Sequence, residues 1–456
     1  MARRPKHPRP TSTPSPEASE PIDTPTGNTE PIATRGPQFG EPAPTPDPDK
    51  FTVKHGSDAQ AYKILDSQKG KLLPRPFPTG AGGDEPVLNL AQALGPKGTD
   101  IVKAITRAGQ LVFHSVGDTG NTKGPHNMEL VADKMVSDYN EKDPRAIPSF
   151  LYHLGDVVYS FGEAQYYYDQ FYDPFRNYPA PIFAVPGNHD GMVAPNSTSS
   201  TLAAFLQNFC AYGEAPHRTP ESGGLVRTAQ VQPGVYFTFE APFVRILALY
   251  SNCLEDPGVI SDQNGSYPSL NDVQLTFLTA ALQRIKKEKF AGAVLIAVHH
   301  PPYVAVNPSR KMNLGRHGSS PFMLQDIDTI CANTGVWAHA ILSGHAHNYQ
   351  RFTRYLDNRE TPFVVAGNGG HALQRLTGYG SPALRTPAIQ TPLSDGQDKV
   401  VFENYDDTGY GYLRLIVNSS QLRIEYHPAS DGDSAKTPDD SVTVDLATRT
   451  LVQYQV

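Results

Sequence analysis

Seven short apolar runs recur along the chain, with helical patterns between them. The runs cover residues 111–116, 149–154, 182–185, 245–251, 293–298, 338–343 and 363–367. Their length and β-branched content are typical of buried strands. Between two of them, the segment 270–290 has its leucines on one helical face, and Asn271 is its expected N-cap. The alternation of strands and helices predicts an α/β fold.

Five of these runs end in polar side chains, usually beside a glycine. In chain order they lead into GDTG with Asp118, GDVVY with Asp156 and Tyr159, PGNHD with Asn188 and His189, HHPPY with His299 and His300, and GHAH with His345 and His347. Open α/β sheets bind their ligands at the carboxyl ends of the strands. Glycine at such an end lets the backbone turn sharply and approach a ligand closely. We therefore expect these side chains to converge on one site.

Each of these motifs also has an ordinary structural explanation. A GD dipeptide is usually a turn, GNHD suits a capping turn, and GHAH fits a solvated loop as well as a metal site. Five polar strand ends in one chain are difficult to explain by structure alone. Carboxylates, an amide oxygen, a phenol and imidazoles are ligands of hard or borderline metals, and none of the motifs contains the cysteine typical of structural zinc sites. Seven donors around two ions predict a two-metal hydrolytic site.

The series GDTG, GDVVY, GNHD, HHPPY and GHAH resembles the calcineurin-like metallophosphoesterases, and within them the purple acid phosphatases. The resemblance covers residues 118–347, with the motifs in the expected order. Most of that superfamily has Asp-x-His in the first motif, where this chain has Gly120. In purple acid phosphatases, this loss accompanies a tyrosine three residues after the second aspartate, and Tyr159 occupies that position.

The resemblance implies a ligand set for each of two metal ions. The first ion, Fe(III), would be bound by Asp118, Asp156, Tyr159 and His347. The second ion would share Asp156 as a bridge and add Asn188, His299 and His345, and it would be Fe(II), Zn(II) or Mn(II). The phenol of Tyr159 has an ordinary pKa of about 10, and a strongly charged metal would bind it as phenolate.

The resemblance also implies a four-layer α-β-β-α sandwich of two mixed sheets, with the dinuclear site at the carboxyl ends of the strands. The implied reaction is hydrolysis of phosphate monoesters by a hydroxide that bridges the two ions. A second interpretation is a phosphodiesterase or nucleotidase on the same scaffold, with zinc or manganese in both sites. A third is a binding domain without catalytic activity, which a complete set of metal ligands makes less attractive.

Two histidines are candidates for delivering a proton or positive charge to the leaving group. His189 is next to the predicted ligand Asn188. His317 follows the fourth motif after an apparent insertion, among Arg310, Lys311 and Arg316, which would attract an anionic substrate; a solvated charged loop is the alternative. The remaining histidines of the motif region are expected to have other roles: His300 in packing or outer contacts, and His114 and His153 in the core. His371 follows a strand end near the site and is assigned no role.

Composition and local pattern predict how the chain divides into a leader, an extension and a catalytic domain. Residues 1–50 are rich in Pro, Thr, Ser and Glu and predict a disordered leader. Residues 51–105 would form an extension that packs on a catalytic domain at 106–456, nearest in organisation to the short tartrate-resistant type. Residues 163–179 and 200–213 are expected to be helices, 411–428 a β-hairpin and 372–408 long loops.

Charge and targeting signals limit the partners. The formal net charge of -7 and the lack of a basic stripe argue against nucleic acid as the main partner. The basic start MARRPKHPRP is not followed by an apolar region, so we expect a cytoplasmic protein without a membrane span, while export stays possible. The partner would be a small phosphate ester. The three cysteines show no disulfide pattern, and the oligomeric state stays open.

Overall fold

A computed structural model of the chain describes residues 72–193, 198, 200–213, 217–305, 317–376, 399–429 and 437–455. All of them fall in one compact unit, Gly40–Val456. The predicted leader at 1–50 and the first part of the predicted extension lie outside the described residues, and the domain boundaries therefore stay a prediction.

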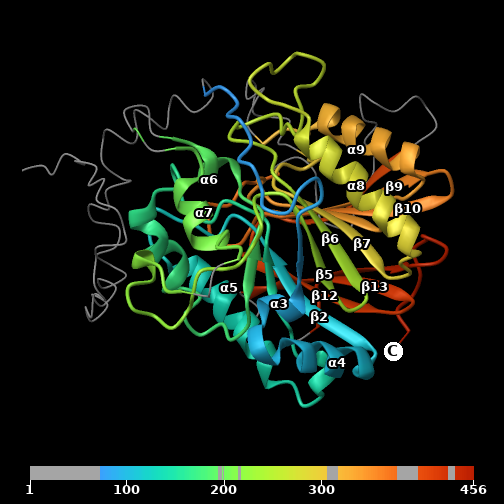
Figure 1. The fold of residues 1–456 in the computed structure, drawn as a ribbon. Coiled ribbons are helices and arrows are strands. Elements are labelled where there is room, and N and C mark those ends of the chain that lie inside the picture. The colour runs from blue at the N-terminus through green and yellow to red at the C-terminus, as the bar shows by residue number, and fades with distance from the viewer. Residues whose placement is uncertain are drawn as a thin grey trace, which may run out of the picture. The chain divides into compact units, whose positions relative to one another are not determined.

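The described strands form two mixed sheets (Figure 1). The eight-stranded sheet has the order β1 (Val87–Asn89), β5 (Phe237–Ala241), β6 (Val244–Leu249), β7 (Ala293–Val298), β8 (Ala340–Ser343), β10 (Arg359–Ala366), β9 (Tyr349–Leu356) and β11 (Lys399–Asp406). The six-stranded sheet has the order β14 (Asp440–Asp445), β13 (Gln421–Pro428), β12 (Gly411–Asn418), β2 (Gln110–Val116), β3 (Leu151–His153) and β4 (Ile182–Ala184). Strands β6, β7, β8 and β10 are parallel, as are β2, β3 and β4.

The helices lie outside the sheets. The described α-helices are α3 (Leu90–Ala93), α4 (Gly98–Ala108), α5 (His126–Ser137), α6 (Asn188–Gly191), α7 (Ala203–Phe209), α8 (Val273–Glu288) and α9 (Pro321–Thr334). Helices α8 and α9 run side by side along the eight-stranded sheet (Figure 1). Among the helices of the described part, none combines the length and apolar character that crossing a bilayer requires.

Strand β7 shows how the layers are built. Its residues alternate between two apolar cores: Ala293, Leu295 and Ala297 face one, and Val294, Ile296 and Val298 face the other. The first core contains side chains of both sheets, including Phe113 and Leu413, and so lies between them. The second core contains residues of α8 and α9, such as Leu278 and Ile327. Because successive side chains of a strand point to opposite faces, an apolar run without polar breaks specifies burial on both faces.

The predicted α/β fold of two mixed sheets packed face to face, with helices outside, is therefore confirmed. Every one of the seven apolar runs forms a strand, as β2, β3, β4, β6, β7, β8 and β10. The predicted hairpin is also present, as β12 and β13, and its turn is held by Asn418, whose Oδ1 accepts from the backbone N–H groups of Ser420 and Gln421.

Three expectations about local structure were wrong. The N-cap of α8 is Asp272 rather than Asn271. The segment 163–179 contains a short 3₁₀ turn, Ala164–Tyr166, and a π-helical stretch, Tyr168–Tyr172, instead of one α-helix, because its aromatic side chains pack into the core on several sides. The segment 372–408 is not loop throughout, since Lys399–Asp406 forms strand β11 at a sheet edge, where pairing with β9 supplies what its weak apolar pattern does not; residues 377–398 lie outside the described residues.

Candidate metal centre

The five polar motifs follow the carboxyl ends of β2, β3, β4, β7 and β8 and meet between the two sheets' edges. Three of their residues, Asp118, Asp156 and His345, have left-handed backbones, with φ of 57°, 54° and 68°. Such conformations cost free energy for residues other than glycine and persist where the surroundings enforce them, often at functional sites. The chain thus turns sharply after the strand and points these side chains into the space beyond it.

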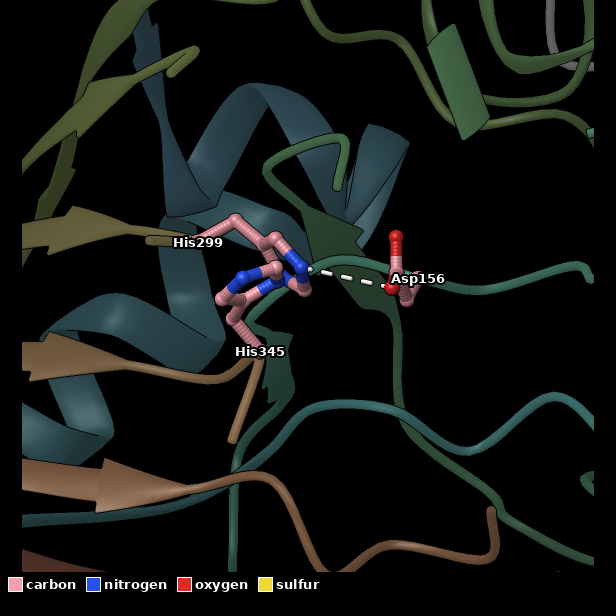
Figure 2. A group of neighbouring side chains, drawn as sticks. All are labelled: Asp156, His299 and His345. Carbon is pink, nitrogen blue, oxygen red and sulfur yellow. Dashed lines mark ion pairs between the residues drawn. The ribbon is translucent and has the colours of Figure 1, made fainter. Parts of the chain in front are cut away.

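One part of the site contains Asp156, Asn188, His299 and His345. The Asn188 Oδ1 atom lies 3.0 Å from His299 Nε2 and 3.0 Å from His345 Nδ1. His299 Nε2 is also 3.3 Å from Asp156 Oδ2. Figure 2 shows Asp156, His299 and His345 directed toward one another, and their candidate ligand atoms lie within 4.8 Å of each other. All four side chains are buried.

The other part contains Asp118, Tyr159 and His347. The Tyr159 hydroxyl donates to Asp118 Oδ1 at 3.0 Å and lies 3.3 Å from His347 Nε2. His347 Nε2 is 3.5 Å from the same Asp118 oxygen. The two parts are joined because the backbone N–H of His345 donates to Asp118 Oδ2 at 2.7 Å. The structure thus brings all seven predicted ligands into one buried cluster, which we call the motif cluster: Asp118, Asp156, Tyr159, Asn188, His299, His345 and His347.

The motif cluster has the chemistry that a cation would complete. Within the described residues, Asn188 Nδ2 and His345 Nε2 are buried without a hydrogen-bond partner, and Asp156 Oδ2 is paired with His299 Nε2 at 3.3 Å. An unpartnered buried polar atom costs about 1–3 kcal/mol, and a set of oxygen and imidazole donors suits hard or borderline metals. The donors present therefore fit the metal pair that the motifs predict, and the binding itself stays a prediction.

Two of the histidines are oriented from outside the cluster. His299 Nδ1 donates to the Leu154 carbonyl oxygen at 2.8 Å, and His347 Nδ1 donates to the Ala372 carbonyl oxygen at 3.0 Å. A ring nitrogen that donates to a carbonyl leaves the opposite nitrogen as the one with a lone pair. In both residues that nitrogen is Nε2, which faces the carboxylates of the motif cluster. His347 is neutral and offers this lone pair directly, whereas His299 Nε2 would first lose a proton to a bound cation.

Burial and neighbouring charge set the protonation of the motif cluster. Burial raises the pKa of Asp118 well above its usual value. Burial lowers the pKa of His299, but Asp156 and Asp118 outweigh it and raise that pKa to about 9. Burial, together with neighbouring histidines, holds the pKa values of His345 and His347 well below the ordinary value. Two neutral imidazoles are thus available as ligands without displacing a proton.

Tyr159 is fixed on several sides. Gln170 binds its backbone twice, accepting from the Tyr159 N–H at 2.9 Å and donating to its carbonyl oxygen at 2.8 Å. The phenol ring lies between two imidazoles, with ring centres 3.8 Å away for His371 and 4.2 Å away for His189. Burial, then Asp118 and Asp156, raises the pKa of Tyr159 well above 10. Without a strongly charged cation, Tyr159 is therefore a neutral phenol.

Gly120 and Tyr159 depend on each other sterically. A Cβ atom at position 120 would lie 2.9 Å from the Tyr159 ring and 2.6 Å from the Val157 carbonyl oxygen. Gln170 Oε1 would lie at 2.7 Å, and real Cβ atoms do not approach so closely, so a side chain at position 120 would require the Val157 backbone, Gln170 and the Tyr159 ring to shift. The sequence pattern that joins a glycine in the first motif to a tyrosine in the second has a physical reason in this structure.

The two candidate proton donors lie against the motif cluster. His189 stacks on Tyr159, and its Nδ1 donates to the Ser160 carbonyl oxygen at 2.8 Å. His317 lies 4.4 Å from the His345 ring and 4.9 Å from the His347 ring, centre to centre. Burial lowers the pKa of His317 to about 4, so at neutral pH it can offer a hydrogen bond but no positive charge. Arg310, Lys311 and Arg316 lie outside the described residues.

His114, His153 and His300 have the core and packing contacts that the sequence predicts. His114 is bonded to Tyr178 and Asp138, and His153 to Thr119, within the core. His300 is held between the Ser251 hydroxyl and the Leu254 carbonyl oxygen. His371, which stacks on Tyr159, lines the site.

The sequence reasoning missed three supporting residues. Asp190 accepts from the backbone N–H groups of Val157, Val158 and Gly187, and so joins the second motif to the third. Its only signal was its position as the last residue of GNHD. Gln170 and Asp256 lie outside the motifs, and nothing in the sequence pattern marks them.

Known proteins resemble this chain at the level of family. A curated relative, "Probable inactive purple acid phosphatase 9" from Arabidopsis thaliana, is 21% identical over 304 residues, which are 63% of this chain and 42% of the relative. The chain therefore spans less than half of that relative's length.

Among solved structures, one described as "Structure of PhoD" has 12% identity and a TM-score of 0.42 over 75% of this chain and 71% of its own. A predicted phosphoesterase from Streptococcus pneumoniae has 11% identity and a TM-score of 0.26 over 74% and 98% of the two chains. A model of the family "Calcineurin-like phosphoesterase" matches residues 112–349, more than half of the chain and all of the motif cluster. This chain belongs to the calcineurin-like phosphoesterase family.

Proposed function

We propose that the chain is a metal-dependent hydrolase of phosphate monoesters with a dinuclear site of the purple acid phosphatase type. The observation that carries the proposal is the pairing of Gly120 with Tyr159, because it replaces an imidazole by a phenol next to Asp118 and His347. Phenolate is a hard donor and favours a trivalent ion such as Fe(III) at that position. The second position, with Asn188, His299 and His345, suits Fe(II), Zn(II) or Mn(II).

When bound, the two cations would lower the pKa of a water molecule and neutralise charge on the phosphoryl oxygens. The chain's own residues would do the rest. Asp156 lies 3.3 Å from His299 Nε2 in one half of the motif cluster and also acts on Tyr159 in the other half, so it would be shared by both cations. Its other oxygen, Oδ1, accepts from the His189 N–H at 2.8 Å, which holds the carboxylate in place.

Two kinds of donor would meet the substrate. Asn188 Nδ2 has no partner among the described residues and would donate to a phosphoryl oxygen. His189, positioned by the Ser160 carbonyl oxygen and by stacking on Tyr159, would donate a proton to the leaving oxygen. His317 would add a hydrogen bond next to His345 and His347.

One observation favours the second candidate function, a phosphodiesterase or nucleotidase with zinc or manganese in both sites. Burial and the two aspartates keep the Tyr159 phenol protonated, and a divalent ion is less able than Fe(III) to overcome that. In such an enzyme the phenol would remain a hydrogen-bond donor to Asp118.

Reconstitution separates the candidates. The purified protein is loaded with iron under mild oxidation, or with Zn(II) or Mn(II), and assayed against phosphate monoesters and diesters, with metal analysis and a visible spectrum of each sample. The proposal predicts a coloured iron form that hydrolyses monoesters. A colourless protein that prefers diesters with Zn(II) or Mn(II) would support the second function, and metal binding without hydrolysis would support a binding domain.

Substitution of the phenol gives the matched test. Tyr159→Phe should remove the colour and lower monoester hydrolysis, whereas Tyr236→Phe, a buried tyrosine that packs on Phe277 in the core under α8, should change neither. If the Tyr159→Phe protein kept both the wild-type spectrum and rate, Tyr159 would not be a ligand.

A further inference from the structure

Asp256 is a buried carboxylate beside the motif cluster that belongs to none of the five motifs. It lies in the connection between β6 and α8, and only 7% of its side chain is exposed. Its Oδ1 atom accepts from the Gly318 backbone N–H and lies 3.8 Å from His345 Nε2. Within the described residues its Oδ2 atom has no hydrogen-bond partner.

Each predicted histidine ligand has one ring nitrogen that faces the motif cluster and one that faces away, which we call the outer nitrogen. Of the three, His345 is the one whose outer nitrogen lacks a hydrogen-bond partner among the described residues. The outer nitrogens of His299 and His347 donate to carbonyl oxygens. His345 directs Nδ1 toward Asn188 Oδ1, at 3.0 Å, so its outer nitrogen is Nε2, which is buried and unpartnered. A neutral imidazole that binds a cation through Nδ1 carries its proton on Nε2, and that proton needs an acceptor.

The His345 ring is held between two other imidazoles. Its centre is 4.2 Å from that of His300 and 4.4 Å from that of His317, with interplanar angles of 39° and 36°. Such packing restrains the tilt of the ring but supplies no bond in its plane. An acceptor for Nε2 is the missing in-plane restraint, and the carboxylate nearest to Nε2 in the described residues is Asp256.

We propose that Asp256 is a positioning residue that accepts the Nε2–H of His345 and so orients Nδ1 toward the second metal ion. The inference rests on the proposed function, because it requires a cation at Asp156, His299 and His345. The same carboxylate, by accepting from the Gly318 N–H, also holds His317 beside His345. One side chain thus connects the second metal position to a candidate substrate-binding histidine.

The test measures Zn(II) binding to the metal-free protein by calorimetry, without any assay of activity. Asp256→Asn keeps the size of the side chain and an oxygen for Gly318, and removes the negative charge. Loss of such an outer partner typically weakens metal binding by about 10–100-fold, and we expect a weakening in that range at one of two sites. Asp326→Asn is the matched control, since Asp326 is a carboxylate on α9 that accepts from the Ser261 hydroxyl at 2.6 Å, away from the motif cluster.

The outcomes separate the two proposals. A wild-type protein that binds no Zn(II) would overturn the proposed function itself. A wild type that binds two ions, with an Asp256→Asn protein that binds them equally tightly, would overturn only the role of Asp256. Equal weakening in Asp326→Asn would also overturn it, because the effect would then be a general loss of stability.

A measurement on the wild type keeps the proposal testable if the variant does not fold. A hydrogen-bonded imidazole N–H that exchanges slowly with water gives a downfield proton resonance. On addition of Zn(II), one such signal should appear and should be absent from the spectrum of His345→Asn. If no signal of the zinc-bound protein depended on His345, Asp256 would not be its acceptor.

Discussion

Two buried clusters of histidine, aspartate and tyrosine among the described residues differ in how their imidazole nitrogens are paired. In the first, at β2, His114 bonds Tyr178 at 3.0 Å and Asp138 at 3.0 Å, and Tyr412 donates to the same Asp138 oxygen at 3.0 Å. We call it the core cluster. In the motif cluster, Asn188 Nδ2 and His345 Nε2 have no hydrogen-bond partner within the described residues. Arg414 Nε, which lies 3.7 Å from Asp138, is also buried without a hydrogen-bond partner. The difference between the clusters therefore lies in their imidazoles: both ring nitrogens of His114 are bonded, whereas His345 Nε2 is not.

One aspartate of each cluster also differs in the direction in which the fold shifts its pKa. Burial raises the pKa of Asp138, but His114, Arg414 and Tyr412 outweigh it and lower that pKa to about 2. For Asp118, burial prevails and holds the pKa well above its usual value. An aspartate whose pKa is lowered by the fold stabilises the fold, and one whose pKa is raised costs stability. Asp138 therefore stabilises the fold, whereas Asp118 costs stability that a bound cation would return. Asp156 resembles Asp138 in this respect: burial raises its pKa, but His299 and His189 outweigh burial and hold that pKa well below the usual value.

The largest expected difference between the clusters is in catalysis. Asp156→Asn should reduce kcat/KM for phosphate monoesters by about 10³-fold or more, because it removes the carboxylate shared by both proposed ions. Asp138→Asn should leave kcat/KM of the folded protein unchanged. Steady-state kinetics with metal analysis check both. Loss of activity in the two variants alike would mean that the comparison fails.

For the free energy of unfolding, unlike for catalysis, we expect the loss in the variant of the core cluster. Burial lowers the pKa of His114, so its ring is neutral at pH 7. Asp138→Asn removes the carboxylate to which His114 and Tyr412 are hydrogen-bonded, and the free energy of unfolding should fall by about 1–3 kcal/mol, as is typical when a buried polar group loses its partner. Denaturant unfolding of the metal-free protein measures it. A change below about 1 kcal/mol, the range of exposed pairs, would show that the core cluster does not stabilise the fold as proposed.

Acid should destabilise the metal-free protein through its buried neutral histidines. Burial lowers the pKa of His339, which lies outside both clusters, to about 4. Because the unfolded chain takes up this proton near pH 6.5 and the folded chain only near pH 4, stability falls as the pH drops through that window. From pH 7 to pH 5, His339 should account for about 2 kcal/mol of the loss.

The variant that checks this is His339→Gln, which should flatten the dependence of unfolding free energy on pH between 7 and 5. His126→Gln, at an exposed position, is the control and should keep the wild-type slope. Equal slopes in all three proteins would contradict the prediction. Hydrolysis of phosphate monoesters should be unaffected by His339→Gln, because His339 lies outside the motif cluster.

The smallest expected effect is a gain in the stability of the metal-free protein. Asp118→Asn removes a buried carboxylate whose ionised form is disfavoured, so the metal-free protein should become more stable by about 1 kcal/mol, while monoester hydrolysis is lost. Thermal unfolding without metal, compared with Asp138→Asn, measures the difference in sign. A destabilised Asp118→Asn protein would place Asp118 with the core cluster rather than the motif cluster.

Local pattern predicted the strands well and the less regular segments poorly. The run at 293–298 is apolar throughout and forms β7 with those limits. The tyrosine-rich segment near 168 was predicted as one helix, because spacing along the chain does not reveal that its rings are buried on several sides. Strand β11 was not predicted, because it is a strand through its pairing with β9 and not through its own apolar content.

The sequence by itself determined which side chains could form the site. Parallel strands of one sheet end at the same edge, so the polar residues after β2, β3 and β4 form one group and those after β7 and β8 another, and the joint change at Gly120 and Tyr159 was visible without coordinates. Packing of the two sheets then brings the two groups together. Only the tertiary structure decided which atoms remain unpartnered and which residues support the ligands. The contact of Asp256 with His345 and the left-handed turn that lets the His345 N–H reach Asp118 join segments far apart in the chain, and such contacts follow from packing of the two sheets rather than from any local pattern.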